Sequence, residues 1–414
     1  MRKIIIHILL ALNIILVFTQ KADAQSPDEL LQMAVVVNQE LKALKKEYHA
    51  ALEKAPQMSQ LLNPEIGVGA FILPVETRLG PQRGRIGITQ MFPWFGTLKA
   101  QEDWAITLAR AKFERIAATE LELRYRISQA YFVLYELQAS QVIIQRNIAL
   151  FESLKELAEV KVSSGKASLA DVLRLDLKID ELTQRLQVLE NRKRKPLAEI
   201  NQILQRNLDA QVLVPDSLSL AELKISQDTL IAKIRSSHPI IRIFELQQEA
   251  SQAAIQVNKF QGKPSFGIGA DYINTGQRSD AFPSNNGRDA FQIRATISIP
   301  LYRKKYQAKD REERFRIEAI EAQKQETISL FEAMIEKAYA DYEDTRLDLG
   351  LYQQQIQTTQ SAIQILEADY TSQSRSFDEL LQLEVSLNEY ELRQLQAVVR
   401  SHLSKAGIER YLPY

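Results

Sequence analysis

The sequence has no cysteine among its 414 residues. It can therefore form no disulfide bond and no thiolate metal site, and it has no thiol for an attached lipid anchor. Histidine is also scarce, and no HExxH, Gly-x-Ser-x-Gly, paired His/Cys or phosphate-binding pattern accompanies it. We therefore expect no enzyme, no cofactor and no metal site. The histidines lie far apart in the chain: His7, His49, His238 and His402.

Neither sign of charge dominates, because 52 Lys and Arg residues balance 52 Asp and Glu residues. This balance gives no basic surface for nucleic acid, which we exclude as a partner. After the N-terminal region, no stretch approaches the roughly 20 apolar residues that a membrane helix needs. A mature chain that enters a membrane must therefore do so through strands.

The N-terminal region has the three parts of a secretory leader. A basic start at Arg2 and Lys3 precedes an apolar run over 4–18, and Ala22-Asp-Ala24 supplies small residues for cleavage. The run is too short for a stable membrane span. We predict a signal peptide over residues 1–24.

The chain repeats itself after roughly 200 residues, which indicates internal duplication. Ser26-Pro-Asp-Glu-Leu30 recurs as Ser226-Gln-Asp-Thr-Leu230, and Asn63-Pro-Glu-Ile-Gly67 recurs as Lys263-Pro-Ser-Phe-Gly267. We predict a first repeat over 25–217 and a second over 218–414. Each repeat is expected to combine a strand pair, about 64–92 and about 264–300, with a long helical hairpin, about 97–207 and about 303–406.

The strand pairs show a period of two residues. Glycine alternates at Gly67 and Gly69, and Gly80-Pro81 and Gly84 suggest a turn before the second strand. The pattern fits a transmembrane strand of roughly 9–11 residues, and on pattern alone it fits an edge strand on a soluble core equally well. Nothing else in the chain resembles a core for these strands, which favours the membrane. In the clearest case, apolar Phe291, Ile293, Ala295, Ile297 and Ile299 alternate with polar Gln292, Arg294, Thr296 and Ser298, which we expect to face a water-filled lumen.

Each strand pair ends in proline followed by large apolar residues, as in Pro93-Trp94-Phe95 and Pro300-Leu301-Tyr302. Such residues suit an aromatic girdle at a membrane interface, and they also suit packing in a protein interior.

The helices that follow are far longer than the globular average. Residues 97–163 contain neither proline nor glycine, and apolar residues follow a heptad register through Leu134 and Phe151 and, on the returning helix, through Leu175 and Leu182. Two such seams joined by a short turn predict an antiparallel coiled coil. We expect Pro196 to kink or break the returning helix.

Three further boundaries are predicted around these hairpins. A first helix should start at the cap Ser26, run to about Lys54 and stop near Pro56. Residues 208–217 should form a linker between the repeats. A helix should follow this linker directly and run to Ser237.

Several short motifs occur in the same order as this architecture: Asn63-Pro64, Gln90-Met-Phe-Pro-Trp-Phe-Gly96, Ala130-Tyr131 with Ala338-Tyr339, and Ser164-Gly-Lys-Ala-Ser-Leu-Ala-Asp-Val-Leu173. With the leader and the tandem repeat, they make the chain resemble the TolC-type outer-membrane efflux proteins, the outer-membrane factors of tripartite efflux or type I secretion systems. The resemblance covers essentially the whole mature chain. It implies an α+β membrane protein in which long antiparallel coiled-coil hairpins accompany four transmembrane strands per chain.

The strand count agrees with what the resemblance implies. Four strands cannot close a barrel, and open edges are not tolerated in lipid. Two chains would supply eight strands, whose interior side chains would fill, whereas three supply twelve and leave an aqueous lumen. We therefore expect a homotrimer with a 12-stranded barrel. The resemblance implies the same assembly, in outer-membrane lipid and continued by an α-helical tunnel in the periplasm.

The resemblance also assigns roles to the hairpin tips. Gly165, Lys166, Ser168 and Asp171 match the tip that docks a periplasmic adaptor, although Gly165 and Asp171 would also turn and cap the hairpin without any partner. Tyr370, Arg375 and Glu379 match the family's gate, and copies of Asp378 or Glu379 around an axis would favour cations. The second tip departs from the family pattern because it lacks the glycine. Carboxylates on a long helix are also ordinary solvated residues.

The predicted function is a passive outer-membrane exit duct that works with an adaptor and an inner-membrane pump. The alternative is a periplasmic adaptor or coiled-coil scaffold without a pore, although such a protein should carry one hairpin between compact β domains. The sequence leaves the transported substrate open among drugs, metal ions, amphiphiles and polypeptides.

Overall fold

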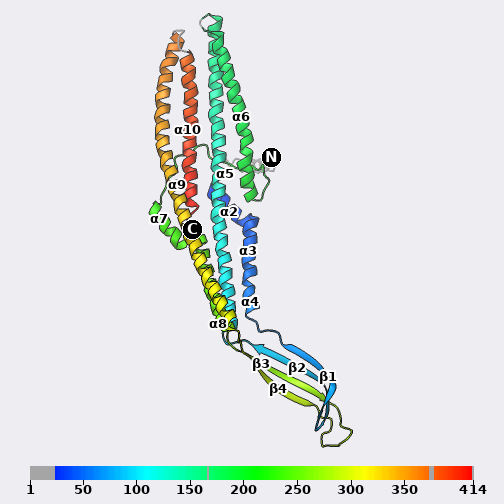
Figure 1. The fold of residues 1–414 in the computed structure, drawn as a ribbon. Helices are drawn as coiled ribbons and strands as arrows, with labels where there is room; N and C mark the ends of the chain where they lie inside the picture. Colours follow the sequence, from blue (N-terminus) through cyan, green and yellow to red (C-terminus); the bar gives the residue numbers. More distant parts are fainter. Residues whose placement is uncertain (1–23, 166, 373–376, 413–414) are drawn as a thin grey trace, which may run out of the picture. The chain divides into compact units, whose positions relative to one another are not determined.

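The computed structural model describes residues 24–165, 167–372 and 377–412, so the predicted signal peptide lies, apart from Ala24, outside the described residues. Figure 1 shows long paired helices and one antiparallel sheet. None of the described helices is both long enough and apolar enough to cross a membrane. The elements are α2 (Pro27–Val37), α3 (Gln39–Leu52), α4 (Lys54–Met58), β1 (Glu65–Thr77), β2 (Gly80–Phe92), α5 (Thr97–Ser163), α6 (Leu169–Ile203), α7 (Gln227–Ser237), α8 (Pro239–Gln261), β3 (Ser265–Thr275), β4 (Ala290–Ser298), α9 (Arg303–Ser372) and α10 (Phe377–Glu409).

The chain divides into two compact units. The first, which we call the hairpin unit, contains the described residues up to Lys42, Ala118–His238 and those from Ser329 onward. The second, which we call the sheet unit, contains Ala43–Ala117 and Pro239–Ile328. Both units draw segments from the two halves of the chain, because α5 and α9 each contribute to both.

The hairpin unit is built on the predicted heptad seams. α5 and α6 form one hairpin and α9 and α10 form the other, and the two share a common core. Burial repeats every three to four residues, as a coiled coil requires. The prediction of these seams is confirmed. Buried members include Ile127, Leu134, Ile144, Phe151 and Ala158 on α5, Val172, Leu175, Leu182 and Leu189 on α6, and Leu380 and Leu381 on α10.

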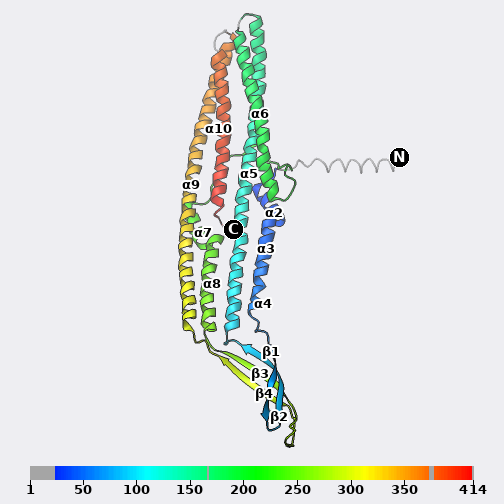
Figure 2. The ribbon, with the colours of Figure 1, turned by 45° about the vertical axis from the view of Figure 1, so that its right-hand side comes forward.

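Residues 204–226, which we call the connecting segment, join α6 to α7 without helical structure. Figures 1 and 2 show this segment crossing the helices of the hairpin unit. Tyrosine hydroxyls from both hairpins satisfy its backbone: Leu218 N donates to Tyr135 Oη (3.0 Å), and Tyr342 Oη donates to Ala221 O (2.6 Å). Tyr339 Oη donates to Ile225 O (2.8 Å). The segment is thereby tied to α5 and α9 together.

These bonds explain why one predicted helix boundary is wrong. The helix expected directly after residue 217 begins only at Gln227, where Ser226 caps it. Several backbone groups within 218–225 form hydrogen bonds with side chains of distant helices. These bonds compete with the backbone hydrogen bonds of a helix.

Two further boundaries differ from the prediction. The first helix, which Ser26 caps as predicted, ends at Val37 because Asn38 accepts a bond from Leu41 N (3.1 Å) and donates to Ile203 O (3.2 Å). Pro56 does not stop a helix but lies in the first turn of α4, where no intrahelical N–H bond is lost. At Pro196, where a kink or a break was expected, α6 continues without a break from Leu169 to Ile203, with Leu189 and Ile200 buried on either side.

The sheet unit contains one antiparallel sheet in the order β1-β2-β3-β4. β1 and β2 are longer than the alternation suggested, and they meet in a tight turn at Arg78-Leu79, not at Pro81 and Gly84, which lie within β2. Gly80 has φ +130°, and a Cβ atom there would lie 1.8 Å from Gly276 O. Only glycine fits this close approach.

A carboxyl group is buried among the helices of the hairpin unit. The Glu384 side chain on α10 is 4% exposed, and burial together with the nearby Glu367 and Glu391 raises its pKa to about 7. Glu391 in turn forms an ion pair with Arg146 of α5. Asn388, one turn further along α10, has a buried Oδ1 without a hydrogen-bond partner. Around neutral pH, Glu384 therefore exchanges a proton inside the helical core.

Removal of the Tyr342 hydroxyl tests the anchoring of the connecting segment. Tyr342→Phe leaves the buried Ala221 carbonyl unpaired, which should cost about 1–3 kcal/mol. We expect a lower thermal midpoint and faster amide hydrogen exchange over 218–225. Tyr125→Phe is the matched control, because the Tyr125 hydroxyl accepts only an exposed bond from Gln129. Equal effects of the two substitutions would contradict the anchoring role.

Glu384 should make the stability of the fold depend on pH. Its pKa is raised in the folded state, so the folded chain holds a proton that the unfolded chain releases between about pH 4.5 and pH 7, and stability falls over that window. Glu384→Gln should therefore stabilise the protein by on the order of 2 kcal/mol at pH 8 and have little effect at pH 4. Unfolding curves at both pH values measure this difference, and a pH-independent effect would refute it.

Candidate functional site: a two-faced sheet and the hairpin tips

The sheet has one face made almost entirely of apolar side chains. Strand register places Ile66 opposite Ile88 and Ala270 opposite Ile293, so these side chains project from the same face. They are not covered by the described residues: Val68 is 78% exposed and Ile293 is 76% exposed. A continuous apolar face of this size marks a surface that meets lipid or protein.

The opposite face is polar, and it carries the residues predicted to line a lumen. Gln292 pairs with Asp271, Arg294 and Thr296 pair with glycines, and Ser298 pairs with Ser265. The predicted residues Gln292, Arg294, Thr296 and Ser298 therefore share one face of β4, and that face continues onto β3 and β2. The alternation of apolar and polar faces is confirmed, whereas the lumen role stays a prediction.

A charge cluster lies on this polar face. Asp271 Oδ1 accepts hydrogen bonds from Arg85 Nε (3.0 Å) and Arg85 Nη2 (2.8 Å), and Arg294 Nη2 lies 3.9 Å away. Arg294 Nη2 also donates to Thr89 Oγ1 at 2.9 Å. The Asp271 side chain is 1% exposed, and a charge buried to this extent needs such partners.

The alternating glycines make room for the cluster. A Cβ atom on Gly87 would lie 2.1 Å from Asp271 Oδ1, and one on Gly269 would lie 3.0 Å from Thr89 Oγ1. The glycines leave a hollow of about 360 Å³ bounded by Glu65, Arg85, Asp271 and Arg294. The sequence pattern pointed to Gly67 and Gly69 but not to Arg85 or Asp271, although both of these residues fall on the polar face of their strands.

At the first hairpin tip, the described residues that were predicted to dock a partner form the turn and cap the helix that follows it. Gly165 has φ +71°, a conformation that favours glycine. Ser168 Oγ accepts a bond from Ala170 N (3.1 Å), and Asp171 Oδ2 accepts one from Ser168 N (3.2 Å), so the two residues cap α6. Lys166 lies outside the described residues. The capping role is therefore present whether or not a partner binds.

An arginine that the sequence analysis missed joins the two tips. Arg174 of α6 forms an ion pair with Asp378, a predicted gate residue on α10, and its Nη1 lies 3.6 Å from Asp171 Oδ1. Arg174 and Asp378 are 49% and 71% exposed, so the pair is solvated and individually weak. A possible sequence signal was the spacing of three residues between Asp171 and Arg174.

The other predicted gate residues are placed only in part. Glu379 is exposed in the first turn of α10, next to Asp378, where acidic side chains favour a helix N-terminus. Tyr370 lies within α9, but its side chain is outside the described residues, as is all of Arg375. The described residues contain no group of three or more His, Cys, Asp or Glu side chains arranged to hold a metal ion.

No family model matches the sequence, and no curated protein matches it. Among solved structures, the chain is similar to the outer-membrane channel OprN, with 19% identity and a TM-score of 0.75 over 94% of this chain and 89% of that one. It is also similar to CusC, whose structures concern folding and transmembrane channel formation, with 17% identity and a TM-score of 0.75 over 94% of this chain and 92% of that one.

A third similar structure is the open state of the MtrE outer-membrane channel of Neisseria gonorrhoeae. It has 16% identity and a TM-score of 0.70 over 94% of this chain and 88% of that one. The chain therefore has the fold of these outer-membrane channels, and the predicted resemblance to the TolC type is confirmed at the level of the fold.

Proposed function

We propose that the chain is one subunit of a trimeric outer-membrane channel that serves as the exit duct of a tripartite efflux or export system. The observation that carries this proposal is the two-faced sheet, with an exposed apolar face on one side and a charged face on the other. A soluble protein would bury such an apolar face. In a barrel, the same face meets lipid and the charged face meets water.

Closure of the barrel explains the assembly. β1 and β4 are the two edges of the sheet, and the described residues supply no further strand to pair with either of them. In lipid, unpaired backbone groups cost several kcal/mol each, so the edges must pair with other copies of the chain. Three copies give twelve strands and a water-filled lumen lined by Gln292, Arg294, Thr296 and Ser298.

The hairpin unit suits the periplasmic part of such a duct. In this proposal the long hairpins of three chains form the tunnel below the membrane, and their tips form its gate. The Arg174–Asp378 ion pair supports the gate assignment, because it ties the first hairpin to the acidic start of α10. Asp378 and Glu379 then form the cation-attracting ring, to which Tyr370 and Arg375 are assigned by resemblance alone.

The first tip is the proposed docking site for the periplasmic adaptor, through which the inner-membrane pump is reached. Gly165, Ser168 and Asp171 form an exposed turn on a rigid hairpin, as docking loops commonly do, and Lys166 belongs to the same turn. The chain itself needs no cofactor in this role, since the energy comes from the pump.

Thiol labelling tests the barrel directly, because the chain has no cysteine of its own. Gln292→Cys and Ile293→Cys are neighbours at one depth on opposite faces of β4. In membranes, a charged thiol reagent should label the lumen-facing Gln292→Cys at least tenfold faster than the lipid-facing Ile293→Cys, because lipid excludes the reagent. Equal labelling would reject the membrane orientation and favour the soluble scaffold.

Single-channel recording tests the gate. Arg174→Gln removes the link between the tips, and an exposed pair is worth about 0.2–1 kcal/mol, so the open probability should rise by up to roughly fivefold per chain. Arg192→Gln, which removes an exposed cation elsewhere on α6, should leave gating unchanged. The charge swap Arg174→Asp with Asp378→Arg should restore closure. No effect of Arg174→Gln would exclude the pair as a gate element.

A further inference from the structure

Two glycines on the edge strand β1 have no side chain over them. Gly67 and Gly69 lie on the polar face of the sheet, opposite Gly87 and Arg85 of β2. Apart from its chain neighbours, a Cβ atom at either position would have no heavy atom within 4 Å. Because alternate residues of a strand share a face, the two glycines leave one continuous stretch of bare backbone along β1.

The corresponding glycines of the second repeat are covered from both sides. Gly267 and Gly269 occupy the same places in β3. From β2, Met91 Sδ would lie 2.5 Å from a Cβ atom on Gly267, and Thr89 Oγ1 would lie 3.0 Å from one on Gly269. From the other side, β4 places a side-chain atom 3.4 Å from each of the two positions. β1 has no neighbour on the side where β2 flanks β3.

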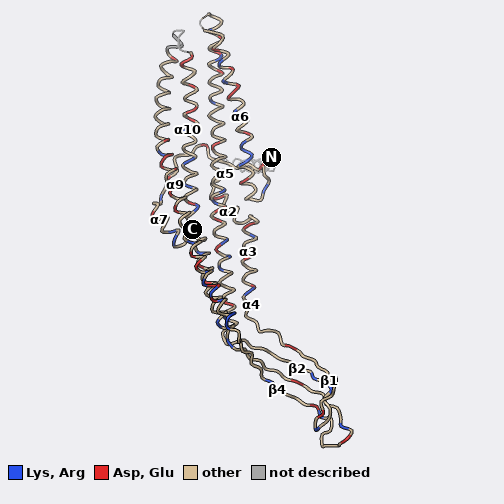
Figure 3. The backbone as a smooth tube through the Cα atoms, in the orientation of Figure 1, with Lys and Arg blue, Asp and Glu red and all other residues tan. Residues whose placement is uncertain are grey.

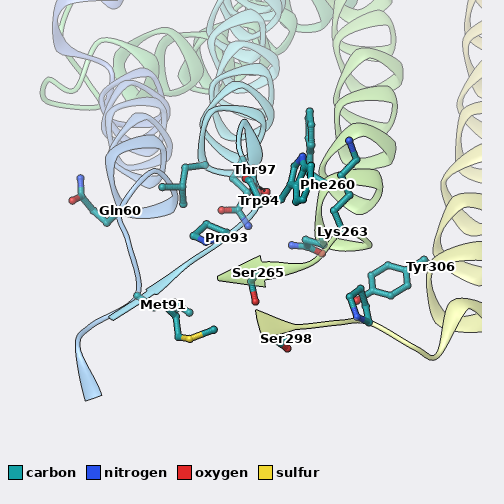
Figure 4. A pocket seen from close by; sticks show the side chains of 15 residues that line it. Gln60, Met91, Pro93, Trp94, Thr97, Phe260, Lys263, Ser265, Ser298 and Tyr306 are labelled. Carbon is teal, nitrogen blue, oxygen red and sulfur yellow. Dashed lines mark hydrogen bonds between the residues drawn. The ribbon is translucent and has the colours of Figure 1, made fainter. Parts of the chain in front are cut away.

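The second repeat contains a counterpart of β2, namely β4. The two strands end in similar sequences, Thr89-Gln-Met-Phe-Pro93 and Thr296-Ile-Ser-Ile-Pro300. Figure 4 shows Met91 near the end of β2 and Ser298 at the end of β4. By this match, Thr296 corresponds to Thr89 and Ser298 corresponds to Met91. These are the positions from which β2 covers the glycines of β3.

Neither edge is protected by charge over the stretch concerned. β1 has no charged residue over 66–73, and β4 has none over 295–298. Figure 3 shows these strands mostly in tan, the colour of uncharged residues. Sheets that must stay unpaired commonly carry charged residues, lysine above all, on their edge strands. These two edges are therefore suited to pair with another strand.

We infer that β4 of one copy of the chain pairs with β1 of the next, with Thr296 opposite Gly69 and Ser298 opposite Gly67. This inference rests on the proposed function, which closes a barrel between these edges, and it adds the register and the contacts of the interface. Thr296 and Ser298 of one copy cover the bare glycines of the next, as β2 covers those of β3. The polar face of β1 is thus completed by a second copy.

This register keeps like faces together. Ile297 falls opposite Val68, and Ala295 falls opposite Ala70, all on the apolar face. In an antiparallel pair, opposite residues project from the same face, so a slip of one residue would place polar side chains among apolar ones. Only registers that differ by two residues preserve the two faces.

Pairing within the two hairpins suggests one such alternative. Thr89 lies opposite Glu65 in the first hairpin, whereas Ser298 lies opposite Ser265 in the second. On that basis Ser298, not Thr296, would be the counterpart of Thr89, and Ser298 would lie opposite Gly69. The interface would then be shifted by two residues toward the far end of β1.

Barrel geometry favours the inferred register over this alternative. Under the inferred register, successive opposite residues lead around one chain to a position six residues further along β1 of the next copy: Glu65, Thr89, Gly269, Arg294 and Phe71. For twelve strands about 4.8 Å apart, with about 3.3 Å per residue, this advance tilts the strands by about 46°, and the alternative tilts them by about 54°. Membrane barrels tilt by roughly 35–45°.

Disulfide crosslinking between copies tests the register, because the chain has no cysteine of its own. Two double variants place cysteines directly opposite each other, within reach of a disulfide: Gly69→Cys/Thr296→Cys and Gly67→Cys/Ser298→Cys. Two matched controls combine the same four sites diagonally, at about 7–8 Å, which is too far for a disulfide: Gly69→Cys/Ser298→Cys and Gly67→Cys/Thr296→Cys.

When the membranes are oxidised, the opposite pairs should form covalent dimers and trimers at least roughly tenfold faster than the diagonal pairs. A disulfide within one chain is excluded, since β1 and β4 are three strand spacings apart, about 14 Å. Each single substitution occurs once among the opposite pairs and once among the diagonal pairs. A folding defect caused by one substitution would therefore slow both classes alike.

The outcomes separate the register from the channel. Faster crosslinking of both opposite pairs supports the inferred register. Faster crosslinking of either diagonal pair, or equal crosslinking of all four variants, overturns it and leaves the channel standing. The absence of any crosslink in a protein that inserts and conducts also overturns it. A chain that does not insert, or that labels equally at Gln292→Cys and Ile293→Cys, refutes the proposed channel and this interface with it.

Discussion

Each chain has a sheet with an exposed apolar face and two edge strands that have no partner among the described residues. The proposed assembly follows from the need to cover this face and to pair these edges. Neither problem can be solved by the described residues of a single chain, since the sheet has only four strands. In the proposed channel, β1 would pair with β4 of another copy, and lipid would cover the apolar face. The long helices do not share this constraint, because their backbone bonds are internal and their seams bury one another.

The polar face shows how a narrow sheet carries charge without losing its regular backbone. Asp271 is buried against Arg85 and near Arg294, and glycine at positions 87 and 269 supplies the space. A side chain at position 87 would collide with Asp271 Oδ1, and one at position 269 would crowd Thr89 Oγ1. Gly87 and Gly269 thus make room for neighbouring side chains, whereas Gly67 and Gly69, which first indicated the period of two residues, have open space around them.

The features that could be predicted from the sequence depend on local repetition. The heptad seams, the cap at Ser26 and the two faces of β4 each follow from the spacing of neighbouring residues. The features that were missed depend on partners far away in the chain. Asn38 ends α2 through a bond to Ile203, and Arg174 meets Asp378, about 200 positions later. Single-sequence patterns contain no information about such pairs, because either member alone resembles a solvated surface residue.

The connecting segment has a mechanical consequence for the hairpin unit. Tyr135 of α5 and Tyr342 of α9 bind the same short stretch of backbone, so the two hairpins are fastened to each other at that level. Thirty residues separate each tyrosine from its tip, a lever arm of about 45 Å at 1.5 Å per residue. A rotation of about 5° around this fastening would displace the tips by roughly 4 Å while the fastened level hardly moves. Small angular changes near the tyrosines would thus become side-chain-sized displacements at Gly165 and Asp378.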